Sequence, residues 1–253
     1  MAVIRWSFPN GTNNDTLTGP LAGGDTVDLT GGTAIISNEQ SLAGVSSLSA
    51  KFDLTVGGSL WYAKESLTGT SYAYDFYLYI TTTFGGTVSV GWAGASASAR
   101  SLSVSIGGSQ QRLNLNDSTG TIWQGAVAAL PTNAWIRISV FGTCGVGTGT
   151  GRVAWYLGHS TTPQEDSGLL TNLSTQTSLN RIRIGGKATA TSVVGGVCYF
   201  GSWAYDTAAT GLIPPYTTGT SVTPWLRGAG TWMPVSMRER DAGAWNPRNT
   251  LLK

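Results

Sequence analysis

The chain has 253 residues and a formal net charge of +2, and only 11% of its residues are charged, compared with about 25% in an ordinary globular domain. It has no run of basic residues of the kind that nucleic-acid-binding domains carry, and no segment approaches the roughly 18 consecutive apolar residues of a membrane-spanning helix. We therefore expect neither a nucleic-acid partner nor a membrane span. A chain of this length buries enough surface to fold without a disulfide or a metal, and we expect no cofactor.

The two cysteines, Cys144 and Cys198, are too few for the disulfide framework of a small secreted protein, and the sequence leaves open whether they pair. The first residues, Met1–Trp6, contain no apolar run of signal-peptide length, so we predict no secretory signal there. A surface rich in Gly, Ser and Thr but poor in charge suits close packing among other proteins. It also suits neutral glycans, whose hydroxyl groups pair with neutral donors and acceptors.

Apolar and polar residues alternate through the middle of the chain, which is the pattern of β-strands with one buried face. The strands are predicted at 72–81, 87–93, 100–107, 134–141, 152–158, 181–185 and 197–206. The first has an apolar face of Tyr72, Tyr74, Phe76, Leu78 and Ile80. Alternation also groups Trp92 with Val88 and Val90, and it places Tyr199, Trp203 and Tyr205 opposite Phe200. Glycine pairs separate the strands as turns and no helical pattern lasts three turns, so the sequence predicts an all-β, two-sheet antiparallel sandwich.

The best candidate for a ligand-binding surface is the second face of the strand at 72–81. If the apolar face fills the core, Asp75, Tyr77 and Tyr79 line the exposed side of the sheet. There the tyrosine rings can stack on a sugar while the carboxylate accepts hydrogen bonds from its hydroxyl groups. The alternative is that these tyrosines pack under a loop or against a neighbouring subunit.

The end of the chain repeats a short phrase, Gly-x-Trp-x-Pro, at Gly230–Pro234 and Gly243–Pro247. The phrase combines a flexible glycine, a large flat ring and a proline that cannot donate to a β-ladder. A linker from about Pro214 to Thr223 precedes it, so we predict a sandwich at residues 1–213 and an irregular C-terminal tail at residues 214–253. The tail docks onto a partner or wraps over the protein's own surface. The residues assigned to docking are Trp225, Trp232, Pro234, Trp245 and Pro247.

Five stretches, in this order, carry a resemblance to a known family: Ser46–Phe52, Trp135–Val140, Gly151–Gly158, Leu179–Gly185 and Gly196–Asp206. Together they resemble the strands of the LamG-like, concanavalin A-like jelly-roll family over roughly residues 4–212. The repeated phrase at the C-terminus resembles the ends of minor tail proteins of phages that infect actinobacteria. The two resemblances imply a jelly-roll fold and a structural protein of a virion, assembled in the host cytoplasm, that contacts the host envelope.

The same fold occurs in glycoside hydrolases, which resemble one another in a strand motif of the type Glu-x-Asp-x-Glu. The motif puts carboxyl groups on one face at the spacing that a retaining mechanism needs. This chain lacks it, because its only adjacent acids, Glu165 and Asp166, fall in a predicted loop. The single histidine, His159, lies just past a strand, where we expect an exposed turn residue. We therefore predict no catalytic residue and no enzyme.

Relatives of this fold often bind calcium through several loop carboxylates. The tightest polar group in this chain, Asn114, Asn116 and Asp117, offers a single carboxylate, which is too few for a calcium loop. We therefore predict no metal site.

Two functions remain. The first is a virion structural protein, in a tail rather than in a head, that displays its jelly roll to a host-surface glycan and binds other virion proteins through its tail; capsid decoration or a head fibre is the variant of this hypothesis. Fibre-like virion parts imply a homo-oligomer, typically a trimer. The second is a free carbohydrate-binding module or glycan-processing enzyme.

Overall fold

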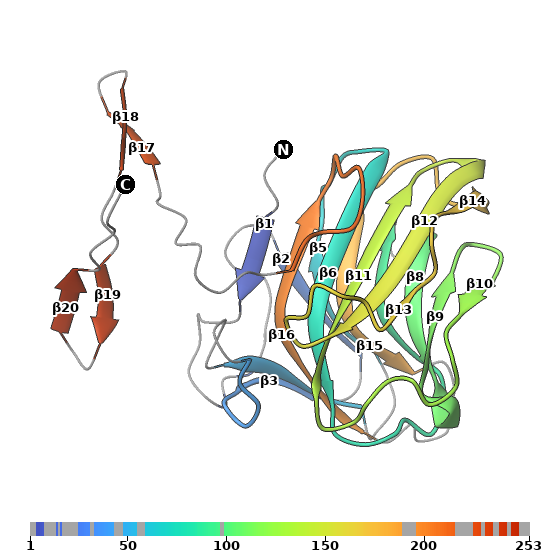
Figure 1. Cartoon of the computed structure of the whole chain (residues 1–253), viewed down its shortest axis with the longest axis horizontal. Coiled ribbons are helices and arrows are strands. Elements are labelled where there is room, and N and C mark those ends of the chain that lie inside the picture. Colours follow the sequence, from blue (N-terminus) through green and yellow to red (C-terminus); the bar gives the residue numbers. More distant parts are fainter. Residues whose placement is uncertain are drawn as a thin grey trace. The chain divides into compact units, whose positions relative to one another are not determined.

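The structure of the protein is a computed structural model. It describes residues 4–7, 14, 16, 25–30, 33–42, 48–54, 59–96, 99–188 and 196–215, and, in the tail, residues 225–228, 231–234, 238–241 and 244–247. Two large antiparallel sheets make up the body, and the described residues contain no α-helix (Figure 1). The predicted all-β, two-sheet antiparallel sandwich is confirmed.

The nine-stranded sheet runs, in spatial order, through β13 (Glu165–Asp166), β12 (Val146–Leu157), β11 (Trp135–Thr143), β6 (Ser71–Ile80), β16 (Val197–Asp206), β4 (Ser49–Asp53) and β3 (Thr33–Ser37), with β14 (Leu170–Ser174) on β12 and β1 (Ile4–Ser7) on β16. The seven-stranded sheet runs through β10 (Thr121–Gln124), β9 (Arg112–Asn116), β8 (Arg100–Gly107), β7 (Val88–Gly94), β15 (Arg181–Ala188), β5 (Ser59–Lys64) and β2 (Asp25–Thr30). A 3-10 turn, η1 (Gly108–Gln110), connects β8 to β9.

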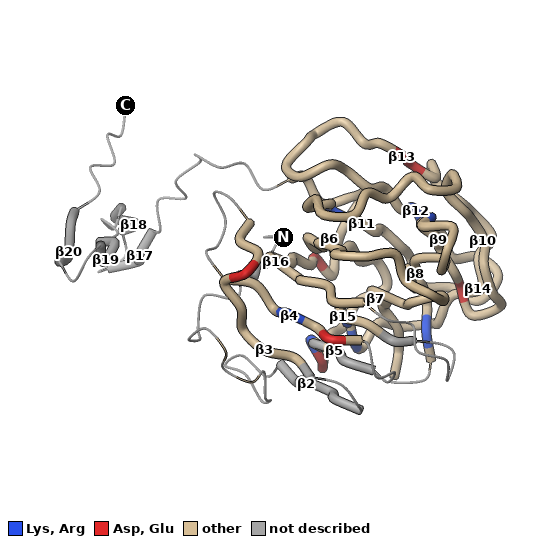
Figure 2. The backbone as a smooth tube through the Cα atoms, turned by 90° about the horizontal axis from the view of Figure 1, so that it is seen from below, with Lys and Arg blue, Asp and Glu red and all other residues tan. Residues whose placement is uncertain are grey.

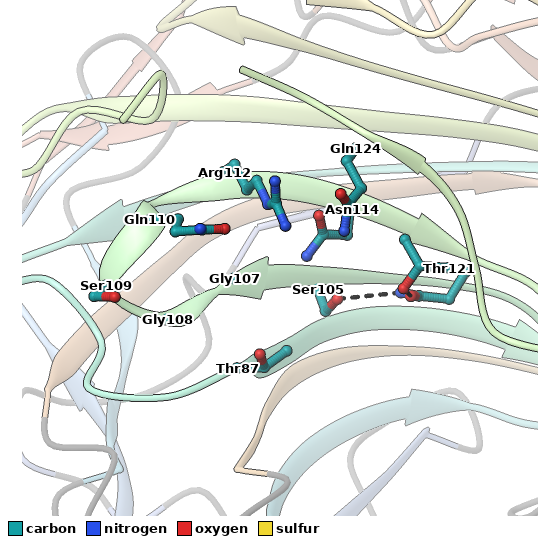
Figure 3. A pocket seen from close by; sticks show the side chains of 11 residues that line it. Thr87, Ser105, Gly107, Gly108, Ser109, Gln110, Arg112, Asn114, Thr121 and Gln124 are labelled. Atoms are coloured by element: carbon teal, nitrogen blue, oxygen red, sulfur yellow. Dashed lines mark hydrogen bonds between the residues drawn. The ribbon is translucent and has the colours of Figure 1, made fainter. Parts of the chain in front are cut away.

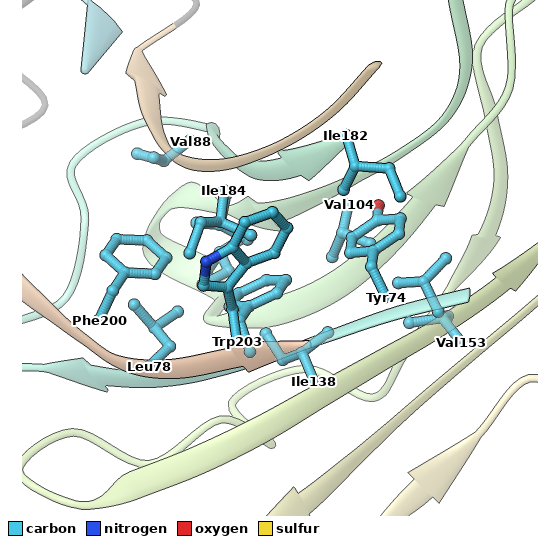
Figure 4. Packing of buried hydrophobic residues seen from close by; sticks show 14 of the residues in the cluster. Tyr74, Leu78, Val88, Val104, Ile138, Val153, Ile182, Ile184, Phe200 and Trp203 are labelled. Atoms are coloured by element: carbon cyan, nitrogen blue, oxygen red, sulfur yellow. The ribbon is translucent and has the colours of Figure 1, made fainter. Parts of the chain in front are cut away.

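The core fills the space between the inner faces of the two sheets (Figure 4). The predicted apolar face of β6 lies in it, from Tyr72 to Ile80, and every member of that face is buried. In Figure 4, Leu78, Phe200 and Trp203 of the nine-stranded sheet point toward Val104 and Ile184 of the seven-stranded sheet. Burial of large side chains from both layers closes the sandwich without a disulfide, and both cysteines are free thiols.

A β-bulge in β7 reverses the face that simple alternation predicts for Trp92. Ser89 lies opposite Ser105 of β8, but Gly91 lies opposite Val104, so Val90 is an extra residue. Beyond the bulge, Gly91 and Ala93 face the core. Trp92 therefore points to the outer side, where the guanidinium of Arg183 lies 5.0 Å from its ring centroid. Grouping Trp92 with Val88 and Val90 was wrong.

A second bulge has the same effect in β16. The register with β6 shifts between Phe200 and Trp203, so Phe200, Trp203 and Tyr205 all belong to the core. Tyr199 lies on the outer face, where its hydroxyl donates a hydrogen bond to Glu39 at 2.5 Å. The predicted grouping of Tyr199 with Trp203 was therefore wrong, because one irregular step inverts all later positions of a strand.

The C-terminal tail contains strands where we expected irregular structure. The chain divides into two compact units, Met1–Tyr216 and Thr217–Lys253. In the second unit, β17 (Trp225–Gly228) pairs with β18 (Thr231–Pro234), and β19 (Arg238–Asp241) pairs with β20 (Ala244–Pro247). Most of the predicted linker, residues 216–223, lies outside the described residues.

The two tail hairpins have the same register. Trp232 lies opposite Arg227 in the first, and Trp245 lies opposite Arg240 in the second. The prolines also match, because Pro234 lies opposite Trp225 and Pro247 lies opposite Arg238. The repeat is thus longer than the phrase first noticed: residues 225–234 and 238–247 both read x-x-Arg-x-Ala-Gly-x-Trp-x-Pro.

Charged residues are sparse over the described part of the body and form no extended run of one sign along the backbone (Figure 2). No helix among the described residues is long and apolar enough to cross a membrane.

Candidate functional site

The structure buries most of the surface that the sequence offered as a glycan-binding face. Asp75 and Tyr77 are each 1% exposed, and only Tyr79 is half-buried. All three lie on the outer side of the nine-stranded sheet, as predicted, but that side is covered. The expectation that Asp75 and Tyr77 line an exposed sheet is therefore wrong, and the alternative that these side chains pack under a loop holds for Tyr77.

Two segments distant in sequence cover this face. After β12 the chain turns at Gly158 and His159, and the Nδ1 atom of His159 lies 2.9 Å from the Tyr77 hydroxyl oxygen. After β16 the segment 207–215 crosses the same face (Figure 1), and Ile213 packs there against Ala73 and Phe141. His159 is the predicted turn residue, but it is half-buried, not exposed.

A buried ion pair lies beneath the second segment. Nη1 of Arg137 lies 3.4 Å from Oδ2 of Asp75 and donates a hydrogen bond of 3.0 Å to the Ile213 carbonyl oxygen. The Arg137 guanidinium also lies 3.9 Å from the ring centroid of Tyr156. Arg137 is completely buried, so this arrangement neutralises the charge of Asp75 and leaves neither group open to a ligand.

The open remainder of the face is aromatic. The ring of Tyr79 meets Trp135 and Tyr199 edge-on, with centroids 5.5 and 6.0 Å away. The polar ends of its neighbours are already bonded within the chain, since Trp135 Nε1 donates to the Ser41 carbonyl oxygen and the Tyr199 hydroxyl donates to Glu39. This cluster holds the segment 38–42 against the sheet, and it offers a ligand little beyond the half-buried ring of Tyr79.

An open pocket of about 340 Å³ lies instead on the outer side of the seven-stranded sheet (Figure 3). It forms there because β8 and β9 alternate regularly: Val104, Ile106, Leu113 and Leu115 fill the core, and the intervening polar residues point outward. The side chains that give the pocket its chemistry are Ser105, Arg112, Asn114, Asn116, Thr121 and Gln124. None of the lining residues is aspartate or glutamate.

Hydrogen bonds within the pocket fix part of its lining. Nδ2 of Asn116 donates to the Ser103 carbonyl oxygen at 3.2 Å and to Oγ of Ser105 at 3.1 Å, the bond drawn in Figure 3. Oγ1 of Thr121 donates to Oδ1 of Asn116 at 2.7 Å. A ligand therefore meets side chains that are already oriented, which lowers the entropic cost of binding.

Two further features of the pocket are an unused hydrogen-bond acceptor and open space beside it. Asn114 is 6% exposed, and its Oδ1 atom accepts no hydrogen bond from any described residue. Beside it, a Cβ atom on Gly107 would lie 3.1 Å from Nδ2 of Asn114 and 3.4 Å from Cγ of Arg112. The glycine thus keeps the pocket open between these two side chains.

The turn between β9 and β10 is fixed by Asp117. Its Oδ1 accepts hydrogen bonds from the backbone N–H groups of Thr119 at 2.8 Å and Gly120 at 3.2 Å, and its Oδ2 accepts one from Ser174 N–H at 2.9 Å. Burial alone would raise the pKa of Asp117, but these hydrogen bonds outweigh it and lower the pKa below its usual value. Asp117 is therefore a structural residue, and the described residues contain no group of three His, Cys, Asp or Glu side chains placed to hold a metal ion.

The adjacent acids Glu165 and Asp166 also have structural partners. They form the short strand β13 and not the predicted loop. Glu165 accepts hydrogen bonds from Trp155 Nε1 at 2.9 Å and from Ala126 N–H at 2.7 Å. Asp166 pairs with Arg152, which lowers the pKa of the aspartate.

Sequence reasoning missed the pocket, although its signal was present. Serines alternate with Leu102, Val104 and Ile106 in the predicted strand at 100–107, and Asn114 and Asn116 were weighed only as calcium ligands. Reading both strands as neighbours, with their polar positions on one outer face, would have located the site. The pairing of Ser105 with Asn114 and of Ser103 with Asn116 makes that face continuous.

Comparison with known proteins agrees with the fold. No protein-family model matches the sequence, and no curated protein matches it. Among solved structures, the chain is similar to the cellulose-induced protein Cip1 with a TM-score of 0.52 and 16% identity, over 82% of this chain and 99% of that one. The chain is also similar to basic winged bean lectin, with a TM-score of 0.48 and 10% identity, over 81% of this chain and 98% of the lectin chain. A mutant of Trypanosoma rangeli sialidase matches with a TM-score of 0.45 and 11% identity, over 74% of this chain and 28% of the sialidase chain. At these identities the likeness concerns the fold alone, a concanavalin A-like jelly-roll sandwich.

Proposed function

We propose that the jelly-roll body is a carbohydrate-binding domain that binds its glycan in the pocket on the seven-stranded sheet. The observation that carries the proposal is the chemistry of the lining, where side-chain amides and hydroxyls converge from neighbouring strands. Sugar hydroxyls both donate and accept hydrogen bonds, as these groups do. A volume of about 340 Å³ lies at the small end of the range for ligand pockets, which suits one or two sugar rings.

The same lining supports binding without catalysis. A glycoside hydrolase of the usual kind needs two carboxyl groups that flank the scissile bond, and the pocket lining has none. The lining therefore does not support hydrolysis by a pair of carboxyl groups, and we propose a domain that recognises its glycan without hydrolysing it.

A glycan array followed by calorimetry tests this function. The double substitution Asn114→Ala/Gln124→Ala removes two amides from the pocket. It is expected to weaken binding of the best array ligand by about 10-fold or more, because polar groups of the bound ligand are then left without hydrogen-bond partners. Gln164→Ala is the matched control, because Gln164 is exposed and lies outside the pocket lining. An array without hits, or equal affinity of the wild type and the double variant, would contradict the proposal.

The tail supports a second function, docking of this domain into a larger assembly. Two successive hairpins share one register, with tryptophan opposite arginine in each, and a four-residue, two-stranded hairpin is marginally stable in water unless it packs on another surface. The C-terminal phrase also resembles the ends of phage minor tail proteins. We therefore propose that the protein is a component of a phage virion, and a minor tail protein in preference to a head decoration or head fibre. Within the particle we propose that it is an oligomer.

Truncation tests the docking function. A chain that ends at Thr220 retains the body, Met1–Tyr216, and is expected to remain folded and soluble but to be absent from purified particles. Subunit labelling in particles that carry the full chain would then place it in the tail or the head. Normal incorporation of the truncated chain would rule out anchoring by the hairpins.

A further inference from the structure

One residue of the pocket lining, Arg112, carries a charge. It is the first residue of β9, it lies opposite Gly107 of β8, and it is partly buried. In Figure 3 it stands beside Asn114 at the same wall of the pocket. The other lining residues are glycines, hydroxyl residues and amides, so nothing within the pocket balances this guanidinium.

Arg112 also differs from three other buried or half-buried arginines of the body. Arg137 pairs with Asp75, Arg152 with Asp166 and Arg181 with Glu65. Over the part of the chain that the structure describes, Arg112 has no carboxylate within ion-pair distance, and its Nε atom has no hydrogen-bond acceptor. A cation that is partly removed from water without a partner is costly, and the binding of an anion offsets that cost.

Asn114 supplies an independent observation that points to the same ligand. Its side chain is more than nine-tenths buried, and its Oδ1 atom lacks a donor. Oδ1 has almost no exposed surface as placed, so the amide must turn toward the pocket to receive a ligand; a hydroxyl group then fits that acceptor, and an anionic oxygen does not. A ligand that complements this wall of the pocket therefore has an anionic group at Arg112 and a hydroxyl donor at Asn114.

A sugar that bears a carboxylate satisfies both demands on one small ring. Resting on the proposed glycan-binding function, we infer that the pocket selects acidic sugars, in which the ring carboxylate pairs with the Arg112 guanidinium and a ring hydroxyl donates to Asn114. Guanidinium and carboxylate are both planar and form two parallel hydrogen bonds, which fixes the orientation of the ring. The remaining amides and hydroxyls of the lining then contact its other hydroxyl groups.

Matched pairs of ligands test the inference by calorimetry. The probes are trimers of galacturonic, glucuronic and mannuronic acid and the methyl esters of the same trimers, which differ only in charge. The wild type is expected to bind the acid form of at least one trimer about 10-fold more tightly than its ester, and added salt is expected to reduce the difference. Equal affinity for acid and ester, or no binding of any acid, would overturn the inference but leave glycan binding intact, whereas a glycan array without hits would contradict glycan binding itself.

Variants of Arg112 identify the group responsible. Arg112→Gln is expected to bring the ratio of acid to ester affinity down to about 1, and a thermal unfolding midpoint close to that of the wild type shows that the variant is folded. Arg112→Lys is expected to retain part of the preference as a point charge. Arg100→Gln is the control, since Arg100 is exposed and lies outside the pocket lining. An Arg112→Gln protein that still prefers the acid would overturn the assignment.

Discussion

Two buried aspartates of this protein have different kinds of hydrogen-bonding and charged partners. Asp75 is paired with a buried arginine on the covered face of the nine-stranded sheet. Asp117 receives backbone N–H groups from its own turn and from Ser174. The first depends on one charged partner, whereas the second depends on the backbone geometry of a turn. Removal of the two carboxylates therefore has different consequences.

Asp75→Ala is expected to lower the free energy of unfolding by about 3–5 kcal/mol, because it leaves Arg137 buried without a counter-charge. The double variant Asp75→Leu/Arg137→Met should recover much of the loss, since Nε and Nη2 of Arg137 have no acceptor among the described residues. Urea denaturation measures both. The control, Arg152→Ala, breaks a more exposed pair and should cost about 1 kcal/mol or less; an equal cost at both sites would contradict the account.

Because of Asp117, we expect the free energy of unfolding to fall at acidic pH. Its pKa is lower in the folded protein than in the unfolded chain, so the ionised form favours folding, and the contribution is complete above the unfolded pKa of about 3.9 and is lost as the pH falls through the lower folded pKa. The difference in unfolding free energy between the wild type and Asp117→Asn should be constant from about pH 7 to pH 5 and then shrink on further acidification. A difference that stays unchanged down to about pH 3 would show that the carboxylate charge is not involved.

At the scale of elements, the alternation of apolar residues was sufficient to predict the main strands and the inner face of β6. It failed at the β7 and β16 bulges, where one extra residue turns Trp92 outward and Trp203 inward. A bulge depends on packing between sheets, which local sequence does not report. At Gly91 the cause is visible only in the fold, since a Cβ atom there would lie 2.9 Å from Cε1 of Phe76 in the opposite sheet.

Gly91→Ala is therefore expected to destabilise the protein by roughly 1–3 kcal/mol, the usual cost of overpacking a core. The rings of Phe76 and Tyr74 must move, because both lie within 3.1 Å of the added methyl group. Gly211→Ala serves as the control, since no atom lies within 4 Å of the Cβ atom that it adds. Thermal denaturation compares the two variants, and the unfolding midpoint of Gly91→Ala is expected to be the lower. Equal midpoints would argue against the tight contact at the bulge.

The covering segments explain why the predicted glycan face was wrong and why the sequence could not reveal it. Asp75 and Tyr77 do lie on the outer side of their strand, as alternation requires. His159 and Ile213, which cover them, come from segments far along the chain. Local pattern assigns a residue to a face of a sheet, but whether that face is open depends on which distant segment crosses it.

At the scale of the whole molecule, the chain forms two compact units, and the first contains the sandwich, the covering segment and the pocket. A chain that ends at Tyr216 is expected to unfold cooperatively with the stability of the full-length body. A chain that ends at Asp206 loses Ile213 and its contacts with Phe141 and Arg137, so it should be several kcal/mol less stable. Calorimetric melting of the two truncated chains compares them; equal melting temperatures would mean that the covering segment contributes nothing to the fold.

We propose that the body binds its glycan on the seven-stranded sheet and not on the predicted face of the nine-stranded sheet. Amide NMR spectra of the chain ending at Tyr216, recorded during titration with the tightest-binding oligosaccharide, test it most directly. Shift changes are expected only for residues near Ser105, Arg112–Asn116 and Thr121–Gln124. Changes centred on Tyr79 and Trp135, with the pocket residues unaffected, would contradict it.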